Sequence, residues 1–204
     1  MLLSACSWIK NKTDYLQEFL SDPRQTGTIA PSSLSLCKTM SDAVDWSTCA
    51  HVAELGAGDG VLTRHLLARM QPHARLLAFE TNPRFHSKLQ EIGDKRLQVS
   101  GASAETLSGE YDAIFSGLPL LSLPHSVRHD ILKRAAQQLA PGGVFIQFQY
   151  TSLLEPLLSS YFDWSRTRVL RNLPPAWVYS CQRLQGQKNQ EDSRWQSLHG
   201  LPGL

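Results

Sequence analysis

The residues with the clearest capacity for chemistry lie in one glycine-rich stretch. Gly56, Gly58 and Gly60 occupy every second position after the apolar run 52–55, and Glu54 stands two residues before the first glycine. Glycines let the main chain turn sharply and let a ligand approach with no Cβ in the way. A helix that follows such a turn presents free N–H groups to the ligand. The pattern predicts a nucleotide-type site at the head of an α/β sheet.

A second carboxylate lies further along the chain. Glu80 ends the next apolar stretch, at about the 20-residue distance from the glycines where α/β folds place an acidic residue on ribose hydroxyls. We therefore expect Glu80 to bind the ribose of the same ligand.

The order of the expected elements explains how these residues come together. Strands are expected at 52–55, 75–80, 96–100, 111–116 and 143–150, and helices at 63–70, 82–92, 126–139 and 153–161. Strands that alternate with helices predict a doubly wound α/β sheet with helices on both faces. In such a sheet the carboxyl ends of the parallel strands share one edge, where ligands bind.

The glycine spacing distinguishes between kinds of nucleotide site. A dinucleotide fingerprint is Gly-x-Gly-x-x-Gly, whereas this chain has Gly-x-Gly-x-Gly. The segment from Glu54 to Gly60 resembles motif I of the class I S-adenosylmethionine-dependent methyltransferases. That resemblance implies S-adenosyl-L-methionine as the cofactor, with Glu54 on the ammonium of its methionine end. It also implies a seven-stranded Rossmann-like sheet, whose antiparallel end the segments 164–170 and 177–183 resemble.

The same resemblance implies an adenine contact in the loop 101–107. Members of the superfamily usually place an Asp there to bind the adenine amino group. In this chain Ser103 occupies the matching position, and Ser103 with the backbone of Ala104 is expected to hold the adenine edge.

The expected fourth strand runs into the loop Ser116-Gly117-Leu118-Pro119-Leu120, at the edge where a methyl acceptor must lie. Enzymes that methylate the amino group of adenine place Asn or Asp, then Pro, then an aromatic residue here, and the ring stacks on the flipped base. This loop lacks both the Asn and the ring. We expect the backbone carbonyls of Ser116, Gly117 and Leu118 to accept hydrogen bonds from a different amine, with Ser116 also beside the cofactor.

This loop resembles that of the bacterial phospholipid N-methyltransferases, which methylate the amine of phosphatidylethanolamine. Residues 27–33, 141–150 and 171–179 resemble the G-x-I-x-P-S-S, P-G-G-x-x-x-Q-F-x-Y and R-N-x-P-P-A segments of that family, in the same order. The resemblance implies methyl transfer to the head-group amine of a phospholipid and contact with a membrane surface.

The acceptor amine must lose a proton, because it is largely protonated at neutral pH and must become neutral before it attacks the methyl group. Tyr150, Tyr15 and a lipid phosphate are the candidates to take the proton. His125 follows the acceptor loop, but it is more simply explained as a solvated residue at a helix start. The transfer is otherwise an in-line displacement that needs alignment of donor and acceptor.

The chain before residue 46 is expected to cover the cofactor. Residues 1–20 have the spacing of an amphipathic helix, whose apolar face either packs on the catalytic domain or inserts at a lipid interface. In the following loop, Ile29 is expected to seal the methyl donor from water. We therefore divide the chain into a cover at 1–45, a methyltransferase domain at 46–183 and a disordered polar tail at 184–204.

Composition sets the outer bounds on function. With 204 residues, 42% of them hydrophobic, the chain can bury one α/β core, and its net charge of +2 allows RNA or a membrane surface as partner without demanding either. The four cysteines have neither metal-ligand nor disulfide spacing. We expect no metal, no membrane span, and a cytoplasmic protein in peripheral contact with the inner face of the membrane.

Three other functions stay open on the sequence. They are methylation of adenine in ribosomal RNA, methylation of a small soluble amine, and binding of S-adenosylmethionine without catalysis. DNA is not an expected partner, and the sequence carries no signal for an oligomeric state.

Overall fold

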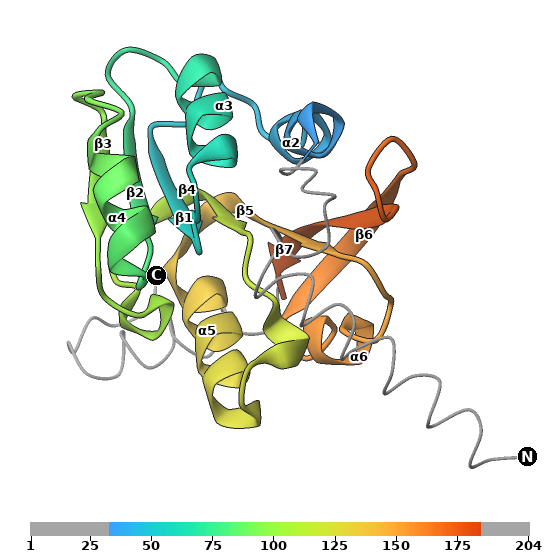
Figure 1. Cartoon of the computed structure of the whole chain (residues 1–204). Coiled ribbons are helices and arrows are strands. Elements are labelled where there is room, and N and C mark those ends of the chain that lie inside the picture. The colour runs from blue at the N-terminus through green and yellow to red at the C-terminus, as the bar shows by residue number, and fades with distance from the viewer. Residues whose placement is uncertain (1–32, 185–204) are drawn as a thin grey trace, which may run out of the picture.

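The structure is a computed structural model, and it describes residues 33–184. A seven-stranded sheet lies at the centre of this region (Figure 1). The strand order is β3-β2-β1-β4-β5-β7-β6. The strands are β1 His51–Leu55, β2 Arg75–Phe79, β3 Leu97–Ser100, β4 Tyr111–Ser116, β5 Leu139–Gln149, β6 Phe162–Val169 and β7 Ala176–Arg183. β7 is antiparallel to β5 and β6, and the other neighbouring pairs are parallel. The predicted doubly wound, Rossmann-like sheet is confirmed.

Helices cover both faces of this sheet. They are α2 Leu34–Ser41, α3 Val61–Arg69, α4 Pro83–Gln90, α5 His125–Gln138 and α6 Glu155–Leu158, with short 3-10 turns η1 Ala104–Thr106 and η2 Leu120–Ser122. On one face α2 and α3 pack in a buried cluster with Val52 and Phe115, and on the other α5 and α6 pack with Leu55 and Phe145. Figure 1 shows α3 and α5 on opposite sides of the sheet.

Local capping signals fix two helix starts near the expected ligand edge. The Ser33 hydroxyl accepts a hydrogen bond from the N–H of Leu36 at 3.1 Å, so Ser33 caps α2. The side chain of Asn82 accepts from the N–H of Arg84 at 3.0 Å, and Pro83 occupies the first turn of α4. Asn82 lies two residues after Glu80, so its cap holds α4 next to the second candidate carboxylate.

Several boundaries differ from those predicted. β5 begins at Leu139, four residues early, because Gly142 at φ 81° lets the chain bulge out and rejoin β4 in a shifted register. The helix expected at 153–161 is reduced to α6, since Phe162 belongs to β6 and stacks on Phe145 with ring centroids 5.1 Å apart.

Part of the predicted domain division lies beyond the region that the structure describes. The amphipathic helix at 1–20, Ile29 and the polar tail from residue 185 are outside the described residues. The helix α2, which the division assigned to the cover, packs directly on the catalytic sheet through the buried side chains of Leu36 and Met40.

Candidate active site

The glycine loop joins β1 to α3 at the carboxyl edge of the sheet. Its glycines all have positive φ, 75° at Gly56, 56° at Gly58 and 82° at Gly60. This left-handed region favours glycine because other residues are strained there. The N–H groups of Gly56 and Ala57 donate to the Phe79 carbonyl at 2.9 and 3.1 Å, which ties the loop to the end of β2. The predicted strand, turn and helix are present.

The space beside the loop differs from one glycine to the next. A Cβ at Gly56 would lie 2.6 Å from Cδ2 of Leu118, and a Cβ at Gly117 would lie 3.0 Å from the Gly56 carbonyl oxygen. The loops after β1 and β4 are therefore in close contact. A Cβ at Gly58 would meet no atom within 4 Å. Gly58 thus leaves open space beside the main chain in which a ligand could lie.

Glu80 links the glycine loop to α4. Its Oε2 accepts from the N–H of Gly58 at 2.8 Å, and its Oε1 accepts from the N–H of Asn82 at 2.7 Å. Each carboxylate oxygen has a second lone pair, so these bonds leave acceptor capacity for ligand hydroxyls. The arrangement suits the predicted ribose contact, which stays a prediction.

Glu54 is buried at the end of β1, on the face covered by α3. Its Oε2 accepts from the Thr63 hydroxyl at 2.7 Å. Burial raises the pKa of Glu54 to about 8, and the Thr63 hydrogen bond offsets this only in part. The carboxyl group therefore stays protonated at neutral pH without a nearby cation. The predicted contact with an ammonium group would supply that cation and favour the ionised form.

The backbone carbonyls of the loop after β4 differ in how many hydrogen bonds they already accept. The N–H of Gly117 donates to the Leu55 carbonyl at 2.9 Å, which anchors the loop to the end of β1. The Leu118 carbonyl already accepts from Leu120 N–H at 2.9 Å and from the Gln147 side chain at 3.2 Å. No hydrogen bond to the Gly117 carbonyl is found within residues 33–184. Of the predicted acceptors, Gly117 is better placed than Leu118 to bind an amine.

Gln147 is a residue of this site that sequence reasoning did not single out. It lies opposite Ser116 in the β4–β5 register and has no exposed surface. Its Nε2 donates to the Leu118 and Phe148 carbonyls, while its Oε1 is buried with no hydrogen-bond partner. The Q-F-x-Y motif contains this residue and was the available signal. The motif gave no indication that the Gln side chain contacts the acceptor loop.

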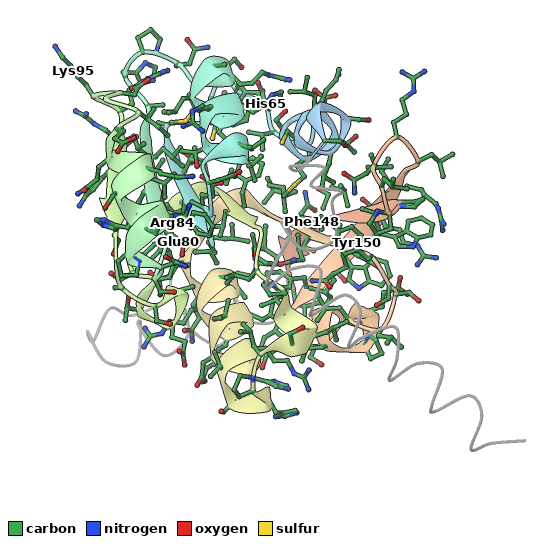
Figure 2. All side chains as sticks on the ribbon, in the orientation of Figure 1. His65, Glu80, Arg84, Lys95, Phe148 and Tyr150 are labelled. Atoms are coloured by element: carbon green, nitrogen blue, oxygen red, sulfur yellow. The ribbon has the colours of Figure 1, made fainter. Side chains whose placement is uncertain are left out.

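Tyr150, one of the candidate proton acceptors, lies just beyond the end of β5. Figure 2 shows Tyr150 beside Phe148, and the two rings meet edge to face with centroids 5.7 Å apart. Burial raises the pKa of Tyr150 above its ordinary value, with an opposing contribution from a hydrogen bond to Asn172. The phenol is therefore harder to ionise than that of an ordinary tyrosine, and its role toward the amine stays a prediction.

The remaining predicted residues have other contacts. The Ser103 hydroxyl caps η1 through the N–H of Glu105 and donates to the Glu105 carboxylate at 3.0 Å, and Ala104 is buried in the core. Their adenine contact stays a prediction. The ring of His125 lies 3.1 Å, measured between Nε2 atoms, from His129, whose Nδ1 lies 2.8 Å from the Tyr161 hydroxyl. This chain of contacts on the surface of α5 accounts for His125 without a catalytic role.

Two general features of the described region bear on function. No helix within residues 33–184 has the length and apolar character to cross a bilayer. The same region contains no cluster of three or more His, Cys, Asp or Glu side chains that could hold a metal ion.

Known proteins share this sequence pattern. A family model described as a methyltransferase domain matches residues 52–143, from the start of β1 into β5. The ornithine lipid N-methyltransferase of Singulisphaera acidiphila is 29% identical over 180 residues, which cover 82% of this chain and 93% of that protein.

Solved methyltransferase structures share the fold. The N-methyltransferase NodS from Bradyrhizobium japonicum superposes with a TM-score of 0.64 at 13% identity, over 77% of this chain and 99% of NodS, and it is also known in complex with S-adenosyl-L-homocysteine. The 1,6-didemethyltoxoflavin-N1-methyltransferase from Burkholderia thailandensis, with S-adenosylhomocysteine bound, has a TM-score of 0.64 at 18% identity over 85% of this chain and 87% of that one. With the glycine loop and the strand order, these similarities show that the chain is a class I methyltransferase that depends on S-adenosylmethionine and resembles the lipid N-methyltransferases.

Proposed function

We propose that this enzyme methylates the head-group amine of a lipid, with phosphatidylethanolamine as the predicted substrate. The observation that carries the proposal is the loop after β4. Gly117 packs against the Gly56 carbonyl, and the loop continues with Leu118, Pro119 and Leu120, which carry no aromatic ring. Such a loop offers no stacking platform to a flipped base, whereas it gives a lipid substrate an apolar approach.

The curated relative supports a lipid amine as the acceptor. That protein is named an ornithine lipid N-methyltransferase, and its match covers most of both chains. Ornithine is a diamino acid, so ornithine lipid and phosphatidylethanolamine both present nitrogen to the methyl donor. The choice between these two head groups is part of the test below.

The residues of the chain have separable roles in this reaction. Glu54, the main chain at Gly58 and Glu80 would hold the cofactor, as their burial, open space and hydrogen bonds allow. When bound, S-adenosylmethionine supplies an electrophilic methyl group on a positively charged sulfur. The Gly117 carbonyl would accept a hydrogen bond from an N–H of the neutral amine. The nitrogen lone pair would then face the methyl carbon, in line with the S–C bond that breaks.

We propose that the proton lost by the amine goes to an acceptor other than Tyr150. The raised pKa of Tyr150 makes the phenol harder to ionise, so we assign it an orienting role beside the amine. A lipid phosphate or water takes the proton before the new N–C bond forms. Because the acyl chains of the substrate lie in a bilayer, we also propose that the enzyme works in peripheral contact with the membrane surface at the cytoplasmic side.

Labelled methyl transfer tests the proposal. The purified protein is incubated with methyl-labelled S-adenosylmethionine and, separately, with vesicles that contain phosphatidylethanolamine, vesicles that contain ornithine lipid, ribosomes, and a panel of soluble amines. We expect label in the lipid fraction, and the labelled head group identifies the substrate. Label in ribosomal RNA or soluble amines with none in lipid would reject the proposal, and tight cofactor binding without any transfer would indicate a binding protein.

A variant control shows that the label arises from this enzyme. Gly58→Val places a branched side chain at φ 56°, in the open space beside the loop. The substituted residue is strained and fills the position where the cofactor would approach. We expect this variant to transfer no label with any substrate.

A further inference from the structure

Most of the exposed large apolar side chains of the described region follow the ends of strands. Within residues 33–184 they are Leu34 (78% exposed), Leu153 (53%), Leu170 (71%) and Leu173 (69%). Leu153 follows β5, and Leu170 and Leu173 lie in the turn between β6 and β7. All three therefore lie just beyond strand ends rather than on a helix face.

Sheet topology places that turn on the edge where the active site lies. β7 is antiparallel to both β5 and β6, so β6 runs parallel to β1, β4 and β5 and ends on the same edge. The register pairs Gln149 with Trp177 and Val169 with Ala176, which places residues 170–175 just beyond the end of β5. Figure 1 shows this hairpin projecting from the sheet next to α2.

The hairpin is held in place by a buried side chain. Asn172 is almost fully buried, its Oδ1 accepts from the N–H of Ser33 at 3.2 Å, and its Nδ2 donates to the Pro174 carbonyl at 2.7 Å. These bonds fix the backbone between Leu170 and Leu173 and bring it next to Leu34, which follows Ser33. The outward position of these leucines is therefore part of the fold.

Toward its turn the hairpin carries charge of a single sign, with Asp163 at its far end. Residues 164–183 contain four arginines and no acidic residue. Arg166 pairs with Glu155, and the guanidinium groups of Arg166 and Arg168 lie over the Trp177 ring at 4.2 and 4.7 Å. Arg171 is exposed at the tip, between the two leucines. Exposed leucines beside arginine and tryptophan are typical of a surface that enters the head-group region of an anionic bilayer.

We infer that the hairpin surface, defined as Leu34, Arg168, Leu170, Arg171 and Leu173, docks on an anionic lipid surface and holds the active-site edge against the head groups. The inference rests on the proposed function, because a lipid substrate requires that this edge reach a bilayer. The leucines enter the head-group region, and the arginines contact lipid phosphates. None of these five residues is among those proposed to hold cofactor or amine, and the contact between the two regions runs through Asn172 to Tyr150.

Vesicle binding tests this surface without any turnover. The full chain is sedimented with vesicles of phosphatidylglycerol and phosphatidylethanolamine, and with vesicles of phosphatidylcholine alone. We expect Leu170→Ser with Leu173→Ser, and separately Arg168→Glu with Arg171→Glu, to weaken binding to the anionic vesicles by about tenfold or more. Wild-type binding should weaken as salt is added. Lys95→Glu is the matched control, since Figure 2 shows Lys95 pointing away from the molecule at the opposite edge.

Methylation of two forms of the same lipid separates docking from catalysis. We expect both double variants to lose activity on vesicles and to keep wild-type kcat/KM on a short-chain phosphatidylethanolamine that is monomeric in water. Wild-type vesicle binding by the variants would overturn the inference, as would an equal loss of activity on the monomeric lipid. If the wild type methylates neither the vesicle lipid nor the monomeric lipid, the proposed function is rejected. The vesicle-binding experiment tests the docking surface independently of that outcome.

Discussion

Gln147 and Leu118 are joined by a hydrogen bond of 3.2 Å from the side-chain Nε2 to the backbone carbonyl. Through this bond β5 supports the loop after β4, in which the acceptor amine is proposed to bind. The other polar atom of the amide, Oε1, is buried and unpartnered. An unpaired buried acceptor costs about 1–3 kcal/mol, and an N–H of the substrate amine is the kind of donor that would relieve it.

Gln147→Leu should therefore affect the acceptor more than the cofactor. We expect kcat/KM for the amine substrate to fall by about tenfold, as expected for the loss of roughly one hydrogen bond in the transition state, while the Kd for S-adenosylmethionine is unchanged. Initial rates at varied lipid concentration and calorimetric titration of the cofactor measure the two quantities.

Gln149→Leu is the matched control for this experiment. Gln149 lies two residues further along β5, is also buried, and pairs in register with Trp177 rather than with the acceptor loop. We expect this variant to keep most of its kcat/KM. Equal losses in the two variants would mean that Gln147 supports β5 in general and not the loop.

Cofactor affinity should depend on pH through Glu54. The pKa of this buried carboxyl is raised to about 8, so below that pH an ammonium group that binds beside it must displace a proton. We expect the Kd for S-adenosylmethionine to fall as the pH rises from about 6 toward 8 and then to level off, with release of a proton on binding. Calorimetry in buffers of different ionisation enthalpy measures that proton. In Glu54→Gln the ammonium group of the ligand still titrates, but residue 54 does not. If the Kd of this variant has the same pH dependence as the Kd of the wild type, the contact assigned to Glu54 is contradicted.

The same carboxyl should make the stability of the ligand-free protein fall as the pH rises. The pKa is about 8 in the folded state against 4.5 for an ordinary Glu. The contribution of a group with a raised pKa is fully present below the unfolded value and is lost as the pH rises through the folded value. We expect the free energy of unfolding of the wild type, relative to that of Glu54→Gln, to decline between about pH 5 and pH 8. Urea unfolding across this range measures the difference, and a constant difference would show that the carboxyl is not perturbed.

The parts of this site that the sequence predicted are those set by local signals. Gly56, Gly58 and Gly60 adopt the left-handed conformations that favour glycine, and Glu80 contacts Gly58 because consecutive parallel strands end on the same edge. The alternation of strands and helices was sufficient for the fold, since each element carries its own periodicity.

The parts that the sequence did not predict depend on register between strands distant in the chain. Gln147 faces the acceptor loop because it lies opposite Ser116, and that pairing follows a register shift in which β5 bulges between Leu139 and Val144, which no local pattern reveals. The perturbed state of Glu54 likewise depends on Thr63 and the packing of α3 over it. A one-residue shift in either case would turn the side chain to the other face.

The contact between Gly56 and Leu118 offers a test of how closely the two loops of the site are coupled. A Cβ at Gly56 would lie 2.6 Å from Cδ2 of Leu118, and at φ 75° any side chain adds strain of about 1–2 kcal/mol. We expect Gly56→Ala to lower the free energy of unfolding by about 2–4 kcal/mol, because strain and overpacking act together. Gly58→Ala, at φ 56° with open space around its Cβ, should show only the strain.

Leu118→Ala removes the atom that the new methyl group would strike, so the double variant should recover the overpacking part of the loss. We expect the double-mutant cycle from urea unfolding to give a favourable coupling of about 1–2 kcal/mol between Gly56→Ala and Leu118→Ala. The same cycle with Gly58→Ala should give none. If the effects of Gly56→Ala and Leu118→Ala are simply additive, the two loops adjust independently, and movement of the acceptor loop would not be transmitted to the cofactor loop.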